Sequence, residues 1–163
     1  MTSPPPLHPA VAPLAGLVGT WTGPGRGEYP TIEDFTYTET VTFGHVGKPF
    51  LAYQQRTMSP AGLPMHAEMG YLRPVGADTA ELVIAQPTGI AEIHTGSMLT
   101  AADGSVEFRF ASATIASTPT AKRVDEVRRT IRWHGDVLSY ELDMSAVGEP
   151  LQFHLSARLQ RSS

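Results

Sequence analysis

The 163-residue chain contains no cysteine. This absence excludes disulfide bonds, thiolate metal sites, iron–sulfur clusters and a cysteine nucleophile. Because small secreted domains often depend on disulfides, it also favours a cytoplasmic protein. The first residues lack the positive charge and apolar stretch of a signal peptide, and no run approaches the roughly 18 apolar residues of a membrane span. We therefore expect no membrane partner.

Charged residues are also scarce, at 17% of the chain, against roughly 25% in an average soluble domain. The formal net charge of -4 argues against nucleic acid as a partner. Hydrophobic residues, at 41%, are numerous enough to form one core. We expect a flexible tail over residues 1–6 and one folded domain over residues 7–163.

The motifs of several enzyme classes are missing as well. The sequence has no Gly-x-Ser-x-Gly elbow and no phosphate-binding loop. None of its six histidines forms an i, i+4 pair or a His-x-His pair, so we do not expect a zinc site. The glycine-rich segment 19–27 is followed by a strand-like stretch and not by a helix, which excludes a dinucleotide fingerprint. We interpret it as a tight barrel corner, with Trp21 plugging one end.

What the sequence does contain is β-structure punctuated by turns. Residues 33–43 alternate strictly, with threonines on one face and Phe35, Tyr37, Glu39, Val41 and Phe43 on the other. Further strands are expected at 49–57, 67–73, 80–86, 90–98, 105–111, 124–133, 137–145 and 151–160, and a short helical turn at 8–18. A meander this long favours a single antiparallel up-and-down β-barrel of about ten strands, with a sandwich as the alternative.

Three groups of side chains are candidates for chemistry. In 151–159, alternation places His154 on the polar face, which is typical of a surface histidine unless that face lines a ligand cavity. Methionines such as Met65, beside His66, and Met144 usually fill gaps in a core. Five cationic residues crowd the segment 122–132, where they indicate a solvated strand face or, alternatively, a site for an anionic ligand group. They are Lys122, Arg123, Arg128, Arg129 and Arg132.

A series of segments along nearly the whole chain, from about residue 7 to 160, resembles the nitrobindin family. In chain order the series is Leu7-His8-Pro9-Ala10-Val11-Ala12-Pro13-Leu14, Gly19-x-Trp21-x-Gly23-x-Gly25, Gly27-Glu28-Tyr29-Pro30-Thr31-Ile32, Gly47-Lys48-Pro49, Pro64-Met65-His66-Ala67-Glu68-x-Gly70-Tyr71, Ala85-Gln86-Pro87-Thr88-Gly89, Leu138-Ser139-Tyr140, Met144 and Pro150-Leu151-Gln152-x-His154-Leu155. One glycine–tryptophan signature alone would be weak, but the ordered series is specific.

This resemblance implies a barrel related in shape to lipocalins and fatty-acid-binding proteins that holds one haem b. It implies that His154 is the proximal ligand of the haem iron, and that Thr31 and Lys122 contact the haem. By the same correspondence, Met65, His66 and Met144 lie near the haem pocket. A ferric iron with one histidine ligand keeps its sixth position open, and the resemblance implies that this iron binds nitric oxide and isomerises peroxynitrite to nitrate.

Two other functions remain open at this point. The same iron could serve a nitric oxide sensor or carrier without catalysis, and a barrel without haem could carry an apolar small molecule. The sequence also leaves the oligomeric state open, with a homodimer among the alternatives.

Overall fold

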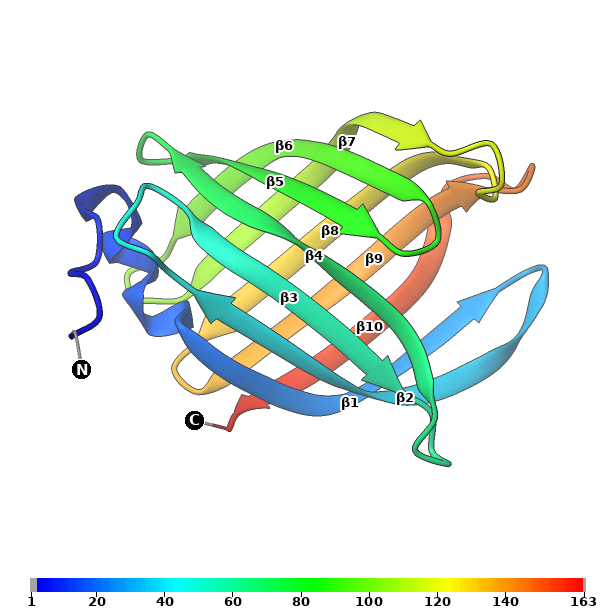
Figure 1. Cartoon of the computed structure of the whole chain (residues 1–163), viewed down its shortest axis with the longest axis horizontal. Helices are drawn as coiled ribbons and strands as arrows, with labels where there is room; N and C mark the ends of the chain where they lie inside the picture. Colours follow the sequence, from blue (N-terminus) through cyan, green and yellow to red (C-terminus); the bar gives the residue numbers. More distant parts are fainter. Residues whose placement is uncertain (1–2, 163) are drawn as a thin grey trace.

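The computed structural model describes residues 3–162, and these form one closed barrel (Figure 1). Each strand pairs antiparallel with its neighbours in the chain, and β1 pairs with β10 to close the sheet. The strands are β1 (Gly19–Tyr29), β2 (Ile32–Gly44), β3 (Leu51–Met58), β4 (Pro64–Val75), β5 (Thr79–Gln86), β6 (Ile90–Thr100), β7 (Val106–Ser117), β8 (Val124–His134), β9 (Val137–Ala146) and β10 (Gln152–Arg161). The predicted ten-stranded up-and-down barrel is confirmed, and the sandwich alternative is wrong.

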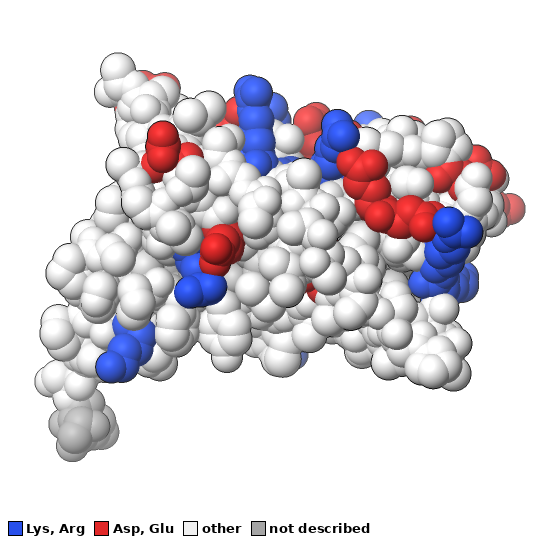
Figure 2. Space-filling model, turned by 90° about the horizontal axis from the view of Figure 1, so that it is seen from above, with Lys and Arg blue, Asp and Glu red and all other residues white. Residues whose placement is uncertain are grey.

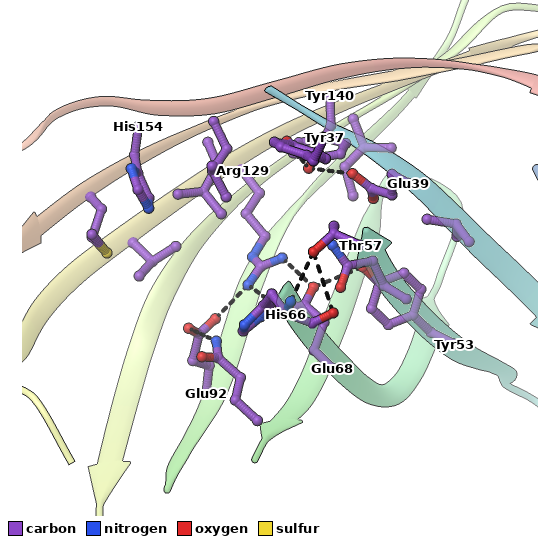
Figure 3. Close-up of a pocket in the computed structure, with 18 of the residues that line it drawn as sticks. Tyr37, Glu39, Tyr53, Thr57, His66, Glu68, Glu92, Arg129, Tyr140 and His154 are labelled. Carbon is purple, nitrogen blue, oxygen red and sulfur yellow. Dashed lines mark hydrogen bonds and ion pairs between the residues drawn. The ribbon is translucent and has the colours of Figure 1, made fainter. Parts of the chain in front are cut away.

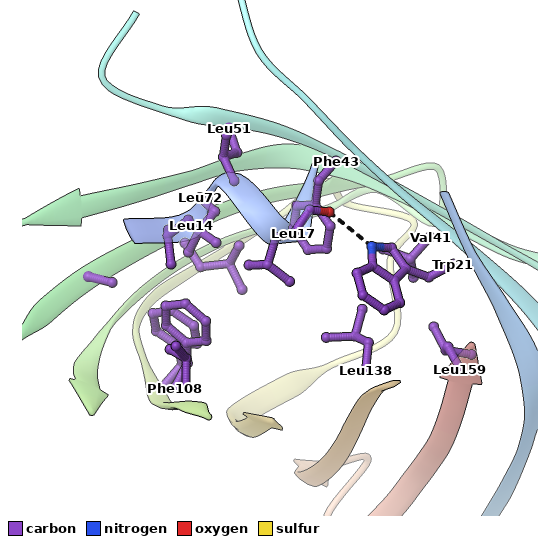
Figure 4. Close-up of a cluster of buried hydrophobic side chains, with 14 of the residues drawn as sticks. Leu14, Leu17, Trp21, Val41, Phe43, Leu51, Leu72, Phe108, Leu138 and Leu159 are labelled. Carbon is purple, nitrogen blue, oxygen red and sulfur yellow. Dashed lines mark hydrogen bonds between the residues drawn. The ribbon is translucent and has the colours of Figure 1, made fainter. Parts of the chain in front are cut away.

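The predicted helical turn is a 3-10 helix, η1 (Pro9–Leu17), which covers one end of the barrel. Nδ1 of His8 accepts a hydrogen bond from the Ala10 N–H at 3.1 Å and so caps the helix start. The helix packs its leucines into the barrel mouth, where Leu17 also accepts a 2.9 Å hydrogen bond through its carbonyl from Nε1 of Trp21 (Figure 4). This end is therefore closed by a cluster of buried apolar side chains.

The glycine-rich segment is a correction to the sequence prediction, because it forms the full-length strand β1 and not a corner. Trp21 does plug the end, with no exposed surface. Gly23, Gly25 and Gly27 follow Trp21 at every second position and so lie on the same face of the strand. A Cβ at Gly25 would lie 2.2 Å from the Tyr37 ring. A Cβ at Gly27 would lie equally close to the ring of Phe35. The missing side chains thus leave room for two rings of β2 to lie across β1.

The up-and-down order sorts the connections onto the two ends of the barrel. The β1–β2, β3–β4, β5–β6, β7–β8 and β9–β10 connections lie at the end opposite η1, which we call the open end (Figure 1). Residues 1–2 of the predicted tail lie outside the described residues, while a Cβ built at Gly47 would lie 3.1 Å from Pro5. Flexibility of the tail stays a prediction. Within residues 3–162, no helix is both long enough and apolar enough to span a bilayer.

Candidate functional site

A cavity of about 280 Å³ occupies the barrel interior between the plug and the open end. Its volume lies just below the range of roughly 300–1,000 Å³ that is usual for ligand pockets. Four of the predicted site residues line it: Met65, His66, Met144 and His154. Strands β4, β9 and β10 supply them, all close to the open end. Figure 3 shows His154 pointing into this space, apart from a deeper group of polar side chains.

His154 reaches the cavity because of a β-bulge, which simple alternation does not reveal. Phe153 pairs with Asp143 and Leu155 with the next residue of β9, Leu142, so His154 is an extra residue in β10. His154 and Leu155 consequently both face the cavity, although they are consecutive. Phe153 lies outside, where the Arg26 guanidinium stacks 4.6 Å from its ring centre. Strict alternation would place His154 on the face opposite Leu155, and the bulge removes that constraint.

The imidazole of His154 is held in one orientation and one tautomer. Its Nδ1 lies 3.0 Å from the carbonyl oxygen of Glu28, an acceptor, so Nδ1 carries the proton and donates it. Tyr29 and Phe35 place their rings edge-on to the imidazole, with centroids 5.2 and 6.4 Å away. Burial lowers the pKa of His154, against an opposing effect of the Glu28 carbonyl and with a small contribution from His66. The result is a neutral imidazole whose lone pair lies on Nε2.

Tyr29, which follows Glu28 at the end of β1, connects this strand to β9 by hydrogen bonds. Its hydroxyl accepts a 2.8 Å hydrogen bond from the Ala146 N–H and lies 3.2 Å from the Met144 carbonyl oxygen. Only 6% of Tyr29 is exposed. The backbone that carries the cavity residue Met144 is therefore tied to the strand that holds the imidazole of His154.

The two remaining predicted residues do not line the cavity. Thr31 lies in the β1–β2 turn and Lys122 in the β7–β8 connection, and both are exposed. Both connections lie at the open end, so these side chains are placed around the entrance and not inside it. Their predicted contacts with a bound group stay predictions.

A buried ionic network crosses the deeper part of the cavity (Figure 3). Arg129 of β8 donates to both oxygens of Glu68 on β4, at 2.7 and 3.2 Å, and to Glu92 on β6 at 2.9 Å. Nε2 of the fully buried His94 donates to Glu92 at 2.7 Å. Burial is the largest single effect and opposes ionisation of both carboxyl groups. The charge of Arg129 and the hydrogen bonds that each carboxylate accepts together outweigh burial and hold the pKa of Glu68 and of Glu92 below the usual range. The network therefore keeps its charges although it is buried.

This network corrects the interpretation of the cationic segment as a solvated face. Arg129 is only 7% exposed. Arg123, Arg128 and Arg132 are exposed as predicted, and each pairs with a nearby carboxylate. On the face seen in Figure 2, cationic and acidic side chains likewise lie beside one another. Exposed pairs of this kind contribute little to stability, whereas Arg129 balances two buried carboxylates.

A second polar group, next to the first, contains two tyrosines and a carboxyl group. The Tyr140 hydroxyl donates to Oε2 of Glu39 at 2.6 Å, and the hydroxyl of Tyr37 lies 2.9 Å from that of Tyr140. Burial raises the pKa of Glu39 to about 7, against the hydrogen bond from Tyr140. Within residues 3–162, Oε1 of Glu39 has no hydrogen-bond partner.

These residues fit a haem ligated by histidine. The donor is a single neutral imidazole whose Nδ1 proton is satisfied by a carbonyl group, the arrangement that orients most histidine ligands of metals. The cavity wall around it is apolar, with Val124, Leu142 and Met144. Lys122, at the entrance, carries a charge of the sign that propionate groups require.

Sequence reasoning missed most of the supporting residues. Tyr29 and Glu28 lie within a segment that carried the family resemblance, but no pattern indicated their hydrogen bonds. Glu39 was visible as a carboxyl group on the apolar face of the 33–43 strand, a signal of a polar function inside the barrel. Nothing in the local sequence distinguished Arg129 from its exposed neighbours.

Comparisons with known proteins agree with this geometry. The family model described as the THAP4-like, heme-binding beta-barrel domain matches residues 10–161. A peroxynitrite isomerase of Nocardia farcinica is 54% identical over 156 residues, which cover 95% of this chain and 92% of that protein. Peroxynitrite isomerase 1 of Mycobacterium tuberculosis is 48% identical over 159 residues, 95% of this chain and 96% of that protein. The crystal structure of Rv2717c from M. tuberculosis has a TM-score of 0.93 and 47% identity, covering 97% of this chain and 100% of that one.

Proposed function

Because the chain belongs to the THAP4-like heme-binding beta-barrel family, we propose that it binds one haem b through His154 and isomerises peroxynitrite to nitrate. The family membership bears out the nitrobindin resemblance. The relatives that are named peroxynitrite isomerases match this chain over nearly its whole length, which supports the same reaction here.

The observation that carries the proposal is the state of the His154 side chain. The bulge in β10 turns the imidazole into the cavity, and the Glu28 carbonyl keeps the proton on Nδ1. Nε2 is thus presented to the cavity in the unprotonated form that binds iron. Tyr29 and Phe35 restrict rotation of the ring, so little conformational freedom is lost when the ligand bond forms.

When bound, ferric haem supplies a Lewis-acidic iron with one open coordination position for peroxynitrite. The chain's own residues hold and surround this group. Met65 and Met144 provide apolar walls without strong hydrogen-bond donors, and His66 lies beside Glu68, with Nε2 3.6 Å from Oε2. Thr31 and Lys122, both exposed at the entrance, would contact the haem in this proposal.

Nitric oxide binding by the same ferric iron is part of the proposal, and sensing or carriage of nitric oxide is the second candidate function. Carriage of a purely apolar molecule is disfavoured by three buried carboxyl groups and one guanidinium in the cavity wall. The absence of cysteine supports a cytoplasmic location, and the homodimer stays a prediction.

The test is a titration of the haem-free chain with haemin, followed by stopped-flow measurement of peroxynitrite decay with nitrate analysis. Wild type is compared with His154→Ala and with the control His134→Ala, which alters an exposed histidine. We expect a ferric Soret band and accelerated decay to nitrate in wild type and control, and neither in His154→Ala. Haem binding with decay at the background rate would leave nitric oxide sensing or carriage. A wild type that takes up no haem would overturn the proposal.

A further inference from the structure

Three of the five tyrosines line the cavity, and their hydroxyl groups do not have equivalent partners. Tyr140 donates to Glu39 at 2.6 Å, and Tyr53 donates to Glu68 at 2.7 Å. Tyr37 joins the first pair through its 2.9 Å contact with Tyr140. The proposed ligation of iron by His154 requires none of these hydroxyl groups. The cavity thus contains two buried phenol–carboxyl pairs that the proposed function does not use.

The carboxyl group that faces Tyr140 is a competent proton acceptor. Glu39 is 1% exposed, and no arginine or lysine forms an ion pair with it within residues 3–162. Burial also raises its pKa to about 7, which makes the ionised form more basic than an ordinary carboxylate. Its ionised form therefore gains from the proton that Tyr140 offers.

The second pair, Tyr53 with Glu68, has a carboxylate that already forms an ion pair, and it serves as an internal comparison. Arg129 clamps both oxygens of Glu68 at 2.7 and 3.2 Å. The pKa of Glu68 is held well below its usual range, although burial alone would raise it. A carboxylate neutralised in this way is a poor acceptor for the proton of Tyr53. The two tyrosines share one cavity but differ in proton-accepting partner.

A row of aromatic rings leads from the haem ligand to Tyr140. The ring of Phe35 lies 6.4 Å from His154 and 6.0 Å from Tyr37, centroid to centroid. Because the Tyr140 proton is directed to Glu39, the Tyr37 hydroxyl faces Tyr140 as a donor and shares its proton with the Ser156 carbonyl oxygen, 3.2 Å away. Tyr140, the phenol furthest along this row, is thus the one whose proton is directed to the carboxyl group of Glu39 (Figure 3).

We propose that Tyr140, with Glu39 as its proton acceptor, is a one-electron oxidation site that consumes nitrogen dioxide radical inside the barrel. The O–H bond of Tyr140 breaks, its electron reduces the radical to nitrite, and its proton passes to Oε2 of Glu39. The phenoxyl radical can then take a hydrogen atom from Tyr37. A second nitrogen dioxide radical forms a C–N bond beside the phenoxyl oxygen, and the hydrogen of that ring carbon moves to the oxygen, giving 3-nitrotyrosine.

This inference rests on the proposed function for the natural source of the oxidant, since homolysis of peroxynitrite yields nitrogen dioxide radical. It does not need the isomerase activity for its test. Radiolysis of nitrate solutions generates the same radical in the absence of peroxynitrite and haem, so the tyrosine chemistry can be measured on the haem-free chain.

The experiment exposes the haem-free and the haem-loaded chain to radiolytic nitrogen dioxide and maps nitration by peptide mass spectrometry. Tyr71, which is 48% exposed, is the reference for simple accessibility. We expect nitration at Tyr140 or Tyr37 to exceed that at Tyr53. In Glu39→Gln, formation of the tyrosyl radical should slow about a hundredfold, the lower end of what a positioned proton acceptor contributes. Tyr53→Phe should leave the radical signal in electron paramagnetic resonance unchanged.

Modification confined to Tyr71 and Tyr53, or an unchanged radical signal in Glu39→Gln, would overturn the inference. The mapping of nitration in wild type needs no variant, so it decides the question even where Glu39→Gln does not fold. A chain that nitrates at Tyr140 but leaves peroxynitrite decay at the background rate would contradict only the proposed function. A chain that isomerises peroxynitrite without oxidation of Tyr140 or Tyr37 would contradict only this inference.

Discussion

The Nδ1 atom of His154 lies 3.0 Å from the carbonyl oxygen of Glu28, although the two residues are 126 positions apart. Each lies where a strand departs from regular pairing: His154 is the extra residue in β10, and the register of β1 against β2 shifts between Gly27 and Tyr29. The two irregularities meet across the β1–β10 seam that closes the barrel. A backbone feature thereby selects the tautomer of the proposed iron ligand.

Deletion of Phe153 should abolish haem binding while every cavity side chain remains in the sequence. Without the extra residue, His154 would pair opposite Asp143 and its side chain would turn to the outer face, because alternate residues of a strand face opposite sides. The Soret band on haemin titration is the measurement, with far-ultraviolet circular dichroism to show that the barrel persists. Phe153→Ala, which keeps the bulge, is the matched control and should retain haem. Haem binding by the deletion variant would show that the bulge does not orient the ligand.

Gly25→Ala should destabilise the barrel by about 1–3 kcal/mol or more, the usual cost of forcing an atom into a packed interior. The added Cβ would lie 2.2 Å from the Tyr37 ring, and that ring is held by hydrogen bonds to Tyr140 and Ser156. Gly44→Ala is the comparison, because nothing lies within 4 Å of a Cβ there. Urea unfolding should show the loss in the first variant and a change below about 1 kcal/mol in the second. Equal urea midpoints for the two variants would show that close packing against Tyr37 does not explain the glycine at position 25.

Arg129→Met should cost about 3–5 kcal/mol, because it leaves the buried carboxylates of Glu68 and Glu92 without their counter-charge. Arg128→Met, one residue earlier with a 58% exposed side chain, should change stability by less than about 0.5 kcal/mol. Adding Glu68→Gln and Glu92→Gln to Arg129→Met should recover most of the loss, since no uncompensated charge then remains. Urea denaturation of the four proteins measures this, and a triple variant no better than the single one would contradict the electrostatic account.

Glu39→Gln should alter how stability depends on pH. Burial raises the pKa of Glu39 from 4.5 to about 7, so between these values the folded chain keeps a proton that the unfolded chain releases. The stability contributed by this group is therefore complete below about pH 4.5 and is lost as the pH rises to about 7, by at most about 3 kcal/mol. The variant lacks this loss, so its stability relative to wild type should increase between about pH 5 and about pH 8. Glu68 and Glu92 titrate in both proteins and cancel in the difference; a constant difference would place the pKa of Glu39 in the ordinary range.

The sequence predicted the parts of the fold that depend on regular alternation. The strand at 33–43 faces inward through Tyr37, Glu39 and Val41, as its pattern indicated. Strand β1 was not recognised because glycine and proline are unfavourable in strands, and the reason for its glycines is the bulk of side chains on β2. The glycines of β1 are explained by the side chains of β2, so the sequence of β1 alone does not indicate a strand.

The site was predictable only through family resemblance, and the physical reason is specific. Alternation assigned His154 to the outside, and a bulge of one residue reversed that assignment. Arg129 resembled its neighbours Arg128 and Arg132, because its partners Glu68 and Glu92 are supplied by strands 61 and 37 residues away. Contacts that depend on barrel closure are not encoded in any local window of sequence.

The plug formed by Trp21 and η1 closes the barrel at one end. His154 lies close to the other end, and Glu39 lies deeper in the same cavity (Figure 3). In the proposed arrangement, a haem held by His154 would lie between Glu39 and the entrance. A molecule next to Glu39 would then have to enter before the haem and leave after it.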